Sequence, residues 1–330
     1  MVAVPYKISL FLTYCCNQRC RTCFIWKKYI EYPKLRDKEL TKDEWGKFFR
    51  NLGNDLHWLL ISGGEPFMRE DLTDIIESIN SKNLSILSMN TNGFLSEKIF
   101  NDIQKILKIL PQKTKFFLTV SLNGFEKTHN LVTGINSYDR AENTYALLKT
   151  LETKMKIFNL ERELTVSKYN LKEFKAMIDD LNRKRIPFTL TFAQESEFYE
   201  NVDKKAMLSQ NDRIALANIL REIKIPMYKK EDLIKRMFKR LAIRSFEKPG
   251  QPIPCYSSWS SVRIDPYGNV YPCIILNDII GNLKDNDLDL KKTLMNSNIK
   301  SIQKKIKNNG CSCWTPCEAY QTIIQNFPFI

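Results

Sequence analysis

Three cysteines near the start of the chain, Cys16, Cys20 and Cys23, have the spacing CxxxCxxC. They follow an apolar run at residues 8–13 that predicts a β-strand, so all three fall in the loop after it. One loop with this spacing can wrap three thiolates around a small inorganic cluster. A structural zinc site is closed by four protein ligands, whereas a four-iron cluster held by three cysteines leaves one iron free. Zinc remains an alternative at this point.

The same loop resembles that of the radical S-adenosylmethionine (SAM) enzymes. The resemblance implies that the three cysteines hold a 4Fe-4S cluster whose free iron binds SAM. Reductive cleavage of SAM then gives a 5'-deoxyadenosyl radical, which abstracts hydrogen from an unactivated C–H bond. Family members usually carry an aromatic residue just before the third cysteine, but here Thr22 stands there and Phe24 follows the cysteine, so Phe24 is the expected adenine contact. Cys15 would allow a second register, and the family spacing leads us to interpret it as a buried or spare thiol.

A glycine-rich segment follows the next predicted strand, residues 57–62, and consists of Gly63, Gly64, Glu65 and Pro66. Paired glycines let the backbone approach a ligand without an intervening Cβ atom. The Glu65 carboxylate and nearby carbonyl groups can accept hydrogen bonds from a cationic amine. The family resemblance implies that this segment holds the amino group of SAM.

Two Asn-Gly turns follow the third and fourth predicted strands, with Asn92 in the first and Asn123 in the second. Asn-Gly is a common turn dipeptide, so each is weak evidence by itself. The resemblance implies that Asn92, Ser121 and Asn123 contact SAM near its ribose and methionine parts. Asn123 stands where the family usually has Asp, and its amide can donate or accept a hydrogen bond but carries no charge. We interpret His129, shortly after this turn, as a structural residue.

The other five cysteines lie in the last quarter of the chain: Cys255, Cys273, Cys311, Cys313 and Cys317. Residues 262–273 predict a β-hairpin with its turn at residues 266–269, which would bring Cys255 and Cys273 toward each other. This region resembles the SPASM or twitch extension of radical SAM enzymes. The resemblance implies one auxiliary 4Fe-4S cluster, with Cys255 and Cys273 as ligands and two of the remaining three cysteines completing the set. A zinc ribbon remains an alternative, because four cysteines also satisfy zinc.

The elements that must position these residues alternate between apolar runs and helical patterns, which is typical of a parallel sheet. Strands are predicted at residues 6–13, 57–62, 84–90, 115–121, 160–167 and 188–193, and helices at 41–52, 71–80, 96–110, 137–151 and 171–182. We predict an α/β protein, with a partial (β/α)6 TIM-like barrel followed by a small α+β iron-sulfur domain. The expected boundaries are 1–195 for the barrel, 196–250 for a basic helical connector and 251–330 for the auxiliary cluster domain.

The composition, 43% hydrophobic and 27% charged in 330 residues, is ordinary for a globular protein. No apolar run reaches the roughly 20 residues that span a bilayer, and the N-terminus lacks a signal-peptide pattern. We therefore expect a cytoplasmic protein without a membrane span. The formal charge of +14 permits a nucleic-acid partner. Lys and Arg are spread along the chain, however, and the densest stretch, residues 229–240, predicts a packed basic helix with a stripe formed by Ile234, Met237, Phe238 and Leu241.

These observations predict a radical SAM oxidoreductase that oxidises or crosslinks a peptide or protein side chain, with the auxiliary cluster as electron acceptor. The first barrel strand begins at about residue 6, which leaves no room for a leader-binding domain before it. A radical SAM dehydrogenase or other modifier of a small polar metabolite or sugar is the first alternative. An RNA-modifying radical SAM enzyme and a zinc-stabilised binding protein are the others. The expected partners are the peptide or small-molecule substrate and an electron donor such as flavodoxin or ferredoxin.

Overall fold

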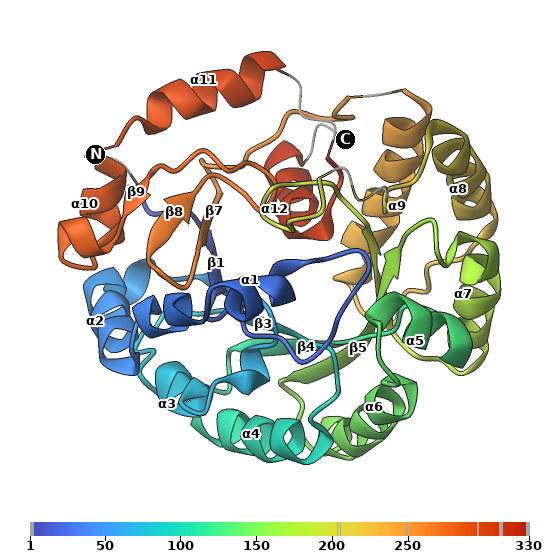
Figure 1. Ribbon diagram of the computed structural model, residues 1–330, viewed down its shortest axis with the longest axis horizontal. Coiled ribbons are helices and arrows are strands. Elements are labelled where there is room, and N and C mark those ends of the chain that lie inside the picture. Colours follow the sequence, from blue (N-terminus) through green and yellow to red (C-terminus); the bar gives the residue numbers. More distant parts are fainter. Residues whose placement is uncertain are drawn as a thin grey trace.

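The computed structural model describes residues 3–202, 204, 206–248, 250–295, 297–309 and 313–327. Six parallel strands follow one another in chain order across one sheet. They curve inside a ring of helices (Figure 1). Their bounds are β1 Lys7–Phe11, β2 Trp58–Ser62, β3 Ile86–Thr91, β4 Lys115–Ser121, β5 Phe158–Val166 and β6 Phe188–Phe192. The predicted partial (β/α)6 barrel is therefore confirmed.

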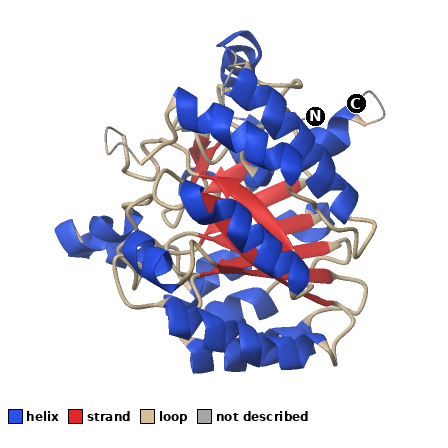
Figure 2. Ribbon diagram, turned by 90° about the vertical axis from the view of Figure 1, so that its right-hand side faces the viewer, coloured by secondary structure: helices blue, strands red, loops and turns tan. Residues whose placement is uncertain are grey.

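The helices that connect these strands cover the outside of the barrel, and a side view shows the strands within a shell of helices (Figure 2). Their bounds are α2 Lys42–Leu52, α3 Leu72–Glu77, α4 Ser96–Ile109, α6 Tyr138–Glu152 and α7 Phe174–Arg183. At the start of α2, Thr41 Oγ1 accepts a hydrogen bond from Glu44 N at 3.3 Å, and the Glu44 carboxylate accepts one from Thr41 N at 2.8 Å. Two short helices, α1 Lys28–Glu31 and α5 Glu126–Thr133, were not predicted from the sequence.

The segment predicted as a connector forms two helices, α8 Gln210–Glu222 and α9 Asp232–Glu247, which pack beside β6. The predicted apolar stripe of α9 faces the protein, since Phe238 and Leu241 are buried there. The Phe238 ring stacks on that of Phe192 in β6, with 5.6 Å between the ring centroids. The two helices therefore extend the wall of the barrel beyond β6, and they link β6 to the C-terminal region.

The C-terminal region continues the sheet of the barrel. Strands β7 Ser261–Ile264 and β8 Asn269–Tyr271 form the predicted hairpin, and β9 Gly281–Asn282 pairs with β8. Because β7 also pairs in parallel with β1, the full order is β6-β5-β4-β3-β2-β1-β7-β8-β9. Three helices follow, α10 Leu290–Met295, α11 Ile299–Asn309 and α12 Pro316–Asn326. The sheet thus crosses the domain boundary that we predicted near residue 250.

Helix α12 packs against α9 and β6 near the open side of the barrel (Figure 1). Just before it, the Trp314 ring stacks on Phe238 of α9 at 5.6 Å between centroids, and Trp314 Nε1 donates a hydrogen bond to the Phe238 carbonyl at 3.1 Å. Cys317, in the first turn of α12, is thereby brought to the barrel. Within the described ranges, every helix is too short or too polar to cross a lipid bilayer.

Candidate active site

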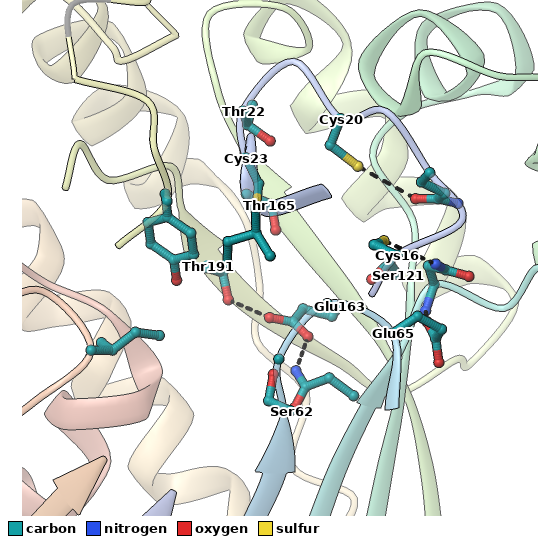
Figure 3. A pocket seen from close by; sticks show the side chains of 18 of the residues that line it. Cys16, Cys20, Thr22, Cys23, Ser62, Glu65, Ser121, Glu163, Thr165 and Thr191 are labelled. Atoms are coloured by element: carbon teal, nitrogen blue, oxygen red, sulfur yellow. Dashed lines mark hydrogen bonds between the residues drawn. The ribbon is translucent and has the colours of Figure 1, made fainter. Parts of the chain in front are cut away.

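A cavity of about 220 Å³ lies at the carboxyl ends of the barrel strands (Figure 3). It brings together most of the residues singled out from the sequence: Cys16, Cys20, Cys23, Gly63, Gly64, Glu65, Asn92, Ser121 and Asn123. Phe24 and Pro66 were also expected at the cofactor but are not among its lining residues. The carboxyl ends of parallel strands are where this architecture places chemistry.

One side of the cysteine loop is held by the end of α5. Arg19 N donates to the Thr133 carbonyl and Arg21 N to the Val132 carbonyl, both at 2.8 Å. Gly134, which ends α5 with a φ of +70°, lies so close that a Cβ atom there would be 2.5 Å from the Arg19 carbonyl oxygen. A helix that the sequence analysis missed therefore fixes the backbone between Cys16 and Cys23.

The other side of the loop is held by the segment after β6. Phe24 N donates to the Tyr199 carbonyl at 2.8 Å, and Asn201 Nδ2 donates to the Thr22 carbonyl at 2.9 Å. The Tyr199 side chain also lines the cavity. Neither Tyr199 nor Asn201 belongs to a recognisable motif, so their role could not be predicted from the sequence.

The paired glycines after β2 make room for the backbone that leads into the cysteine loop. A Cβ atom on Gly63 would lie 2.4 Å from the Thr13 carbonyl oxygen, and one on Gly64 would lie 2.2 Å from that of Cys15. Hydrogen bonds of 2.8 Å join Gly64 N to Thr13 O and Glu65 N to Cys15 O. The missing Cβ atoms thus serve contact between two loops, although we expected them to serve contact with a ligand.

Glu65 is buried and ties the ends of β2 and β3 together. Its Oε1 accepts hydrogen bonds from Thr91 Oγ1 at 2.9 Å and Phe67 N at 3.3 Å, and its Oε2 accepts one from Asn92 N at 2.7 Å. Burial raises the pKa of Glu65 to about 7, and these hydrogen bonds oppose that rise. Both carboxylate oxygens already have partners, so backbone carbonyls are the freer acceptors for an amine at this segment.

Buried donors of the cysteine loop fit an iron-sulfur cluster. Burial raises the pKa of Cys16 to about 12 and that of Cys23 to about 11, so a metal that binds these thiols must displace their protons. In the described part of the chain, Asn17 Nδ2 and Gln18 Nε2 are buried donors without an acceptor. Donors of this kind suit an anionic group, because a buried unpaired donor costs stability.

The residues next to the three loop cysteines differ in whether they line the cavity. Cys15 Sγ lies 3.9 Å from Met68 Sδ and does not line the cavity, which favours the register that begins at Cys16. Trp26 lines the cavity where Phe24 does not, and the two ring centroids are 6.2 Å apart. The adenine contact of Phe24 remains a prediction, with Trp26 as the aromatic residue of this loop at the cavity.

The turns after β3 and β4 place three polar side chains at the cavity. Asn92 Nδ2 lies 3.9 Å from Cys16 Sγ, and Ser121 and Asn123 line the same cavity. Asn123 N donates to His129 Nδ1 at 3.2 Å, while His129 Nε2 lies 3.1 Å from Ser137 Oγ. Burial lowers the pKa of His129 to about 4, so the ring is neutral at pH 7. These contacts support the structural interpretation of His129.

Glu163 of β5 is the cavity residue that the sequence analysis missed. Its carboxylate accepts hydrogen bonds from Thr119 Oγ1 and Thr191 Oγ1, each at 3.0 Å, and from Asn90 Nδ2 (Figure 3). These donors are uncharged and come from β3, β4 and β6. The signal was the spacing of two between Glu161 and Glu163 in β5, which directs both acids to one face of the strand.

The described C-terminal cysteines do not all line one cavity. Cys255 and Cys313 line a small separate cavity, and Cys255 is one of the charges that raise the pKa of the buried Cys273. Cys273 Sγ accepts hydrogen bonds from Ile275 N at 3.4 Å and Leu276 N at 3.2 Å. Cys317 lines the main cavity instead, and burial raises its pKa to about 11.

The fourth ligand of an auxiliary cluster is therefore still a prediction, and the predicted ligand Cys311 lies outside the described residues. In the described ranges, no three His, Cys, Asp or Glu side chains lie close enough together to hold one metal ion. The backbone amides on Cys273 and its proximity to Cys255 fit thiolate ligands.

Two family models match the chain. One, described as the Radical SAM superfamily, covers residues 10–181, and the other, described as an iron-sulfur cluster-binding domain (SPASM), covers residues 255–318. The chain belongs to the radical SAM superfamily. Its cofactors are accordingly SAM and iron-sulfur clusters, and it is an enzyme of this superfamily with a C-terminal SPASM domain.

Among curated proteins, the radical SAM chain is similar to a probable GTP 3',8-cyclase of Methanococcus maripaludis, with 38% identity over 28% of this chain and 30% of that protein. It is also similar to an Fe-coproporphyrin III synthase of Methanosarcina barkeri, with 27% identity over 52% of this chain and 40% of that one. The matches thus span less than half of either relative. Among solved structures, native anSMEcpe with bound AdoMet aligns over 98% of this chain and 96% of its own at 17% identity, with a TM-score of 0.62. That likeness shows the fold.

Proposed function

We propose that this radical SAM enzyme abstracts hydrogen from a C–H bond of a peptide or protein side chain and oxidises that carbon. The observation that carries the proposal is the position of Glu163, a carboxylate in the same cavity as the three loop cysteines and Cys317. A substrate radical that becomes a more oxidised product must lose one electron and one proton. Glu163 would accept that proton in the cavity that the loop cysteines and Cys317 both line.

The segment 62–64, Ser121 and Asn123 would hold SAM, because their polar groups line the cavity next to the cysteine loop. When bound, SAM and the clusters supply the radical that removes hydrogen and an acceptor for the substrate's electron. The chain's own residues orient the substrate and exclude water. Phe11, Ile25 and Tyr199 provide the apolar walls for that purpose.

Glu163 would receive the proton that leaves the oxidised carbon or its attached heteroatom. Its three hydrogen-bond partners fix the carboxylate in the barrel and leave it without a paired cation in the described part of the chain. A general base must lie within hydrogen-bond reach of the proton it accepts. A substrate between Tyr199 and Thr191 would satisfy that condition, since both residues line the cavity with Glu163.

A small polar molecule is the second candidate substrate. The cavity of about 220 Å³ is lined by several hydroxyl groups, including those of Ser62, Thr165 and Thr191, which suit a polyol or sugar. The names of similar proteins point to both kinds of substrate: a GTP cyclase among the relatives, and anSMEcpe solved with the Cp18Cys peptide at a TM-score of 0.60 and 18% identity. The reductant of the enzyme would be a flavodoxin or ferredoxin.

The test uses anaerobically reconstituted enzyme with SAM and dithionite. Candidate substrates deuterated at the reacting carbon are a peptide encoded beside the gene and a set of small polyols. Deuterium in 5'-deoxyadenosine from the peptide, together with a peptide product that has lost two hydrogens, supports the proposal. Deuterium from a small metabolite while the peptide stays unmodified overturns the peptide substrate.

The variant Glu163→Gln, in the same assay, tests whether Glu163 accepts the proton. We expect 5'-deoxyadenosine to form at close to the wild-type rate while oxidised product falls by about 100-fold or more. Glu161→Gln is the matched control, because Glu161 lies two residues earlier on the same strand and pairs with Lys235. Equal product from the wild type and Glu163→Gln would remove Glu163 from the reaction.

A further inference from the structure

The barrel contains a second cavity, of about 180 Å³, at the opposite end from the cysteine loop. Its lining includes Lys7, Trp58 and Ile86, which are the first residues of β1, β2 and β3. We call the cavity at the carboxyl ends of the strands the reaction cavity. Four residues line both cavities: Leu60, Asn90, Glu163 and Cys317. We call it the amino-end cavity, because the strands are parallel and start there.

The walls of the amino-end cavity are mainly apolar. Strand, α9 and α12 side chains contribute to them: Trp58, Leu60, Ile86, Met89, Phe117, Ile234, Tyr320 and Ile324. Ile324 is 44% exposed, so the cavity reaches the surface along α12. An apolar pocket with few polar groups favours a ligand with an apolar body and one polar end.

Most charged groups around this cavity have partners. Lys235 Nζ lies 2.7 Å from Glu161 and 3.2 Å from Asp232, and Glu231 pairs with Lys115. The remaining three are held by neutral groups. Lys229 Nζ donates to Asn159 Oδ1, Glu163 accepts from Asn90, Thr119 and Thr191, and Lys7 Nζ donates to the Cys317 carbonyl.

Lys7 differs from Lys229 in its burial, although it too is held by a neutral acceptor. Its side chain is buried, at 2% exposure, and its Nζ donates a hydrogen bond to the Cys317 carbonyl. The same atom lies 4.8 Å from the centroid of the Trp58 ring, which also lines the cavity. In the described part of the chain, Lys7 forms no ion pair with a carboxylate. An ammonium group has three donors, and a buried cation without a counter-ion is costly.

We propose that the amino-end cavity binds a ligand with an apolar body and a carboxylate, and that the carboxylate pairs with Lys7. The apolar walls accept the body of the ligand, and the unpaired ammonium supplies the charge that selects its head. This site lies beyond the reaction cavity and does not depend on the proposed oxidation. Because the two cavities share Glu163 and Cys317, a ligand bound here would lie directly beneath the reaction site.

The experiment measures binding of octanoate and of octanamide to the reconstituted full-length protein by calorimetry. The two probes have the same apolar body and differ in the charge of the head. We expect octanoate to bind the wild type at least about tenfold more tightly than octanamide. Lys7→Met should remove this preference and leave octanamide binding unchanged, whereas Lys7→Arg should retain it.

Two further variants locate the probes. Lys229→Met, at the same cavity, should keep the preference for octanoate, since Lys229 is held by Asn159. Ile324→Trp should weaken the binding of both probes, because the larger side chain fills the exposed mouth of the amino-end cavity. Ile324 does not line the reaction cavity, so this variant distinguishes the two cavities. Equal affinity for octanoate and octanamide in the wild type would overturn the proposal, as would unchanged binding in Ile324→Trp. Either result would mean that Lys7 contacts the Cys317 carbonyl and binds no ligand carboxylate.

Discussion

The two groups of cysteines are positioned by different means. Cys16, Cys20 and Cys23 lie on one loop and line one cavity, and hydrogen bonds from α5 and from the segment after β6 hold that loop. The described C-terminal cysteines come from the segments before β7, after β8 and around the start of α12, and Cys317 lines a different cavity from Cys255 and Cys313. Local spacing therefore determines the first group, whereas tertiary packing determines the second.

The strongest test of this contrast is a pair of adjacent substitutions. Cys16→Ala should reduce dithionite-driven formation of 5'-deoxyadenosine to background, because it removes a thiol from the cavity. Cys15→Ala should keep the activity, because Cys15 faces Met68 instead. Loss of activity in Cys15→Ala and retention in Cys16→Ala would shift the cluster-binding register by one residue.

Iron content tests whether the C-terminal cysteines form a site of their own. Reconstituted protein should hold roughly eight irons, from two clusters of four. Cys255→Ala should lose about half of them and still form 5'-deoxyadenosine, while a triple Cys16, Cys20 and Cys23 to Ala variant should lose the other half together with the activity. Colorimetric iron and sulfide assays measure this. Zinc without sulfide in the native protein would contradict both predictions.

Gly64→Ala tests how closely the first loop is held. The added Cβ would meet the Cys15 carbonyl oxygen at 2.2 Å, so we expect a loss of about 1–3 kcal/mol in the free energy of unfolding. We also expect less iron bound by the loop cysteines. Gly53→Ala is the control, since no atom lies within 4 Å of its Cβ position and only its positive φ of +53° is strained. Thermal unfolding and iron content are the measurements. A cluster lost equally in both variants would show that the close contact is unimportant.

The last prediction concerns acid stability near the first loop. Burial lowers the pKa of His129 to about 4 from an ordinary value near 6.5. Above pH 6.5 the ring is neutral in both folded and unfolded protein, so nothing is lost there. As the pH falls toward 4 the unfolded state binds a proton that the folded state does not, which costs on the order of 3 kcal/mol.

His129→Gln should therefore show a shallower loss of stability between pH 6.5 and 4 than the wild type does. Urea unfolding at pH 7 and pH 5 under anaerobic conditions measures the difference. Identical slopes for the wild type and His129→Gln would exclude His129 as the titrating group.

Apolar runs were sufficient to locate the barrel strands, and β4 at Lys115–Ser121 matches its predicted bounds. The cysteine loop and the turns with Asn92 and Asn123 were found because short motifs follow those strands. Glu163 was missed because a charged residue within a strand looks like a solvent-facing position until the barrel closes around it. Tyr199 was missed because its contribution depends on where the loop after β6 returns.

The pairing of β7 with β1 had no local signal in the sequence either. The residues of β1 are buried at all five positions, which is typical of a strand covered on both faces, but this pattern does not indicate its second neighbour. That neighbour comes from a hairpin whose turn chemistry was readable and whose docking site was not. Contacts between distant segments are therefore the part of this fold that pattern analysis leaves open.

That same pairing has a consequence for synthesis of the chain. Residues 7–10 find their partners at residues 261–264, so most of the protein must emerge from the ribosome before β1 is covered on both sides. Until then β1 presents a bare row of amides and carbonyls, which is a template for pairing with another nascent chain. Closing so long a loop also makes the step slow. A protein truncated before residue 261 should therefore aggregate, even though every strand of the barrel is present.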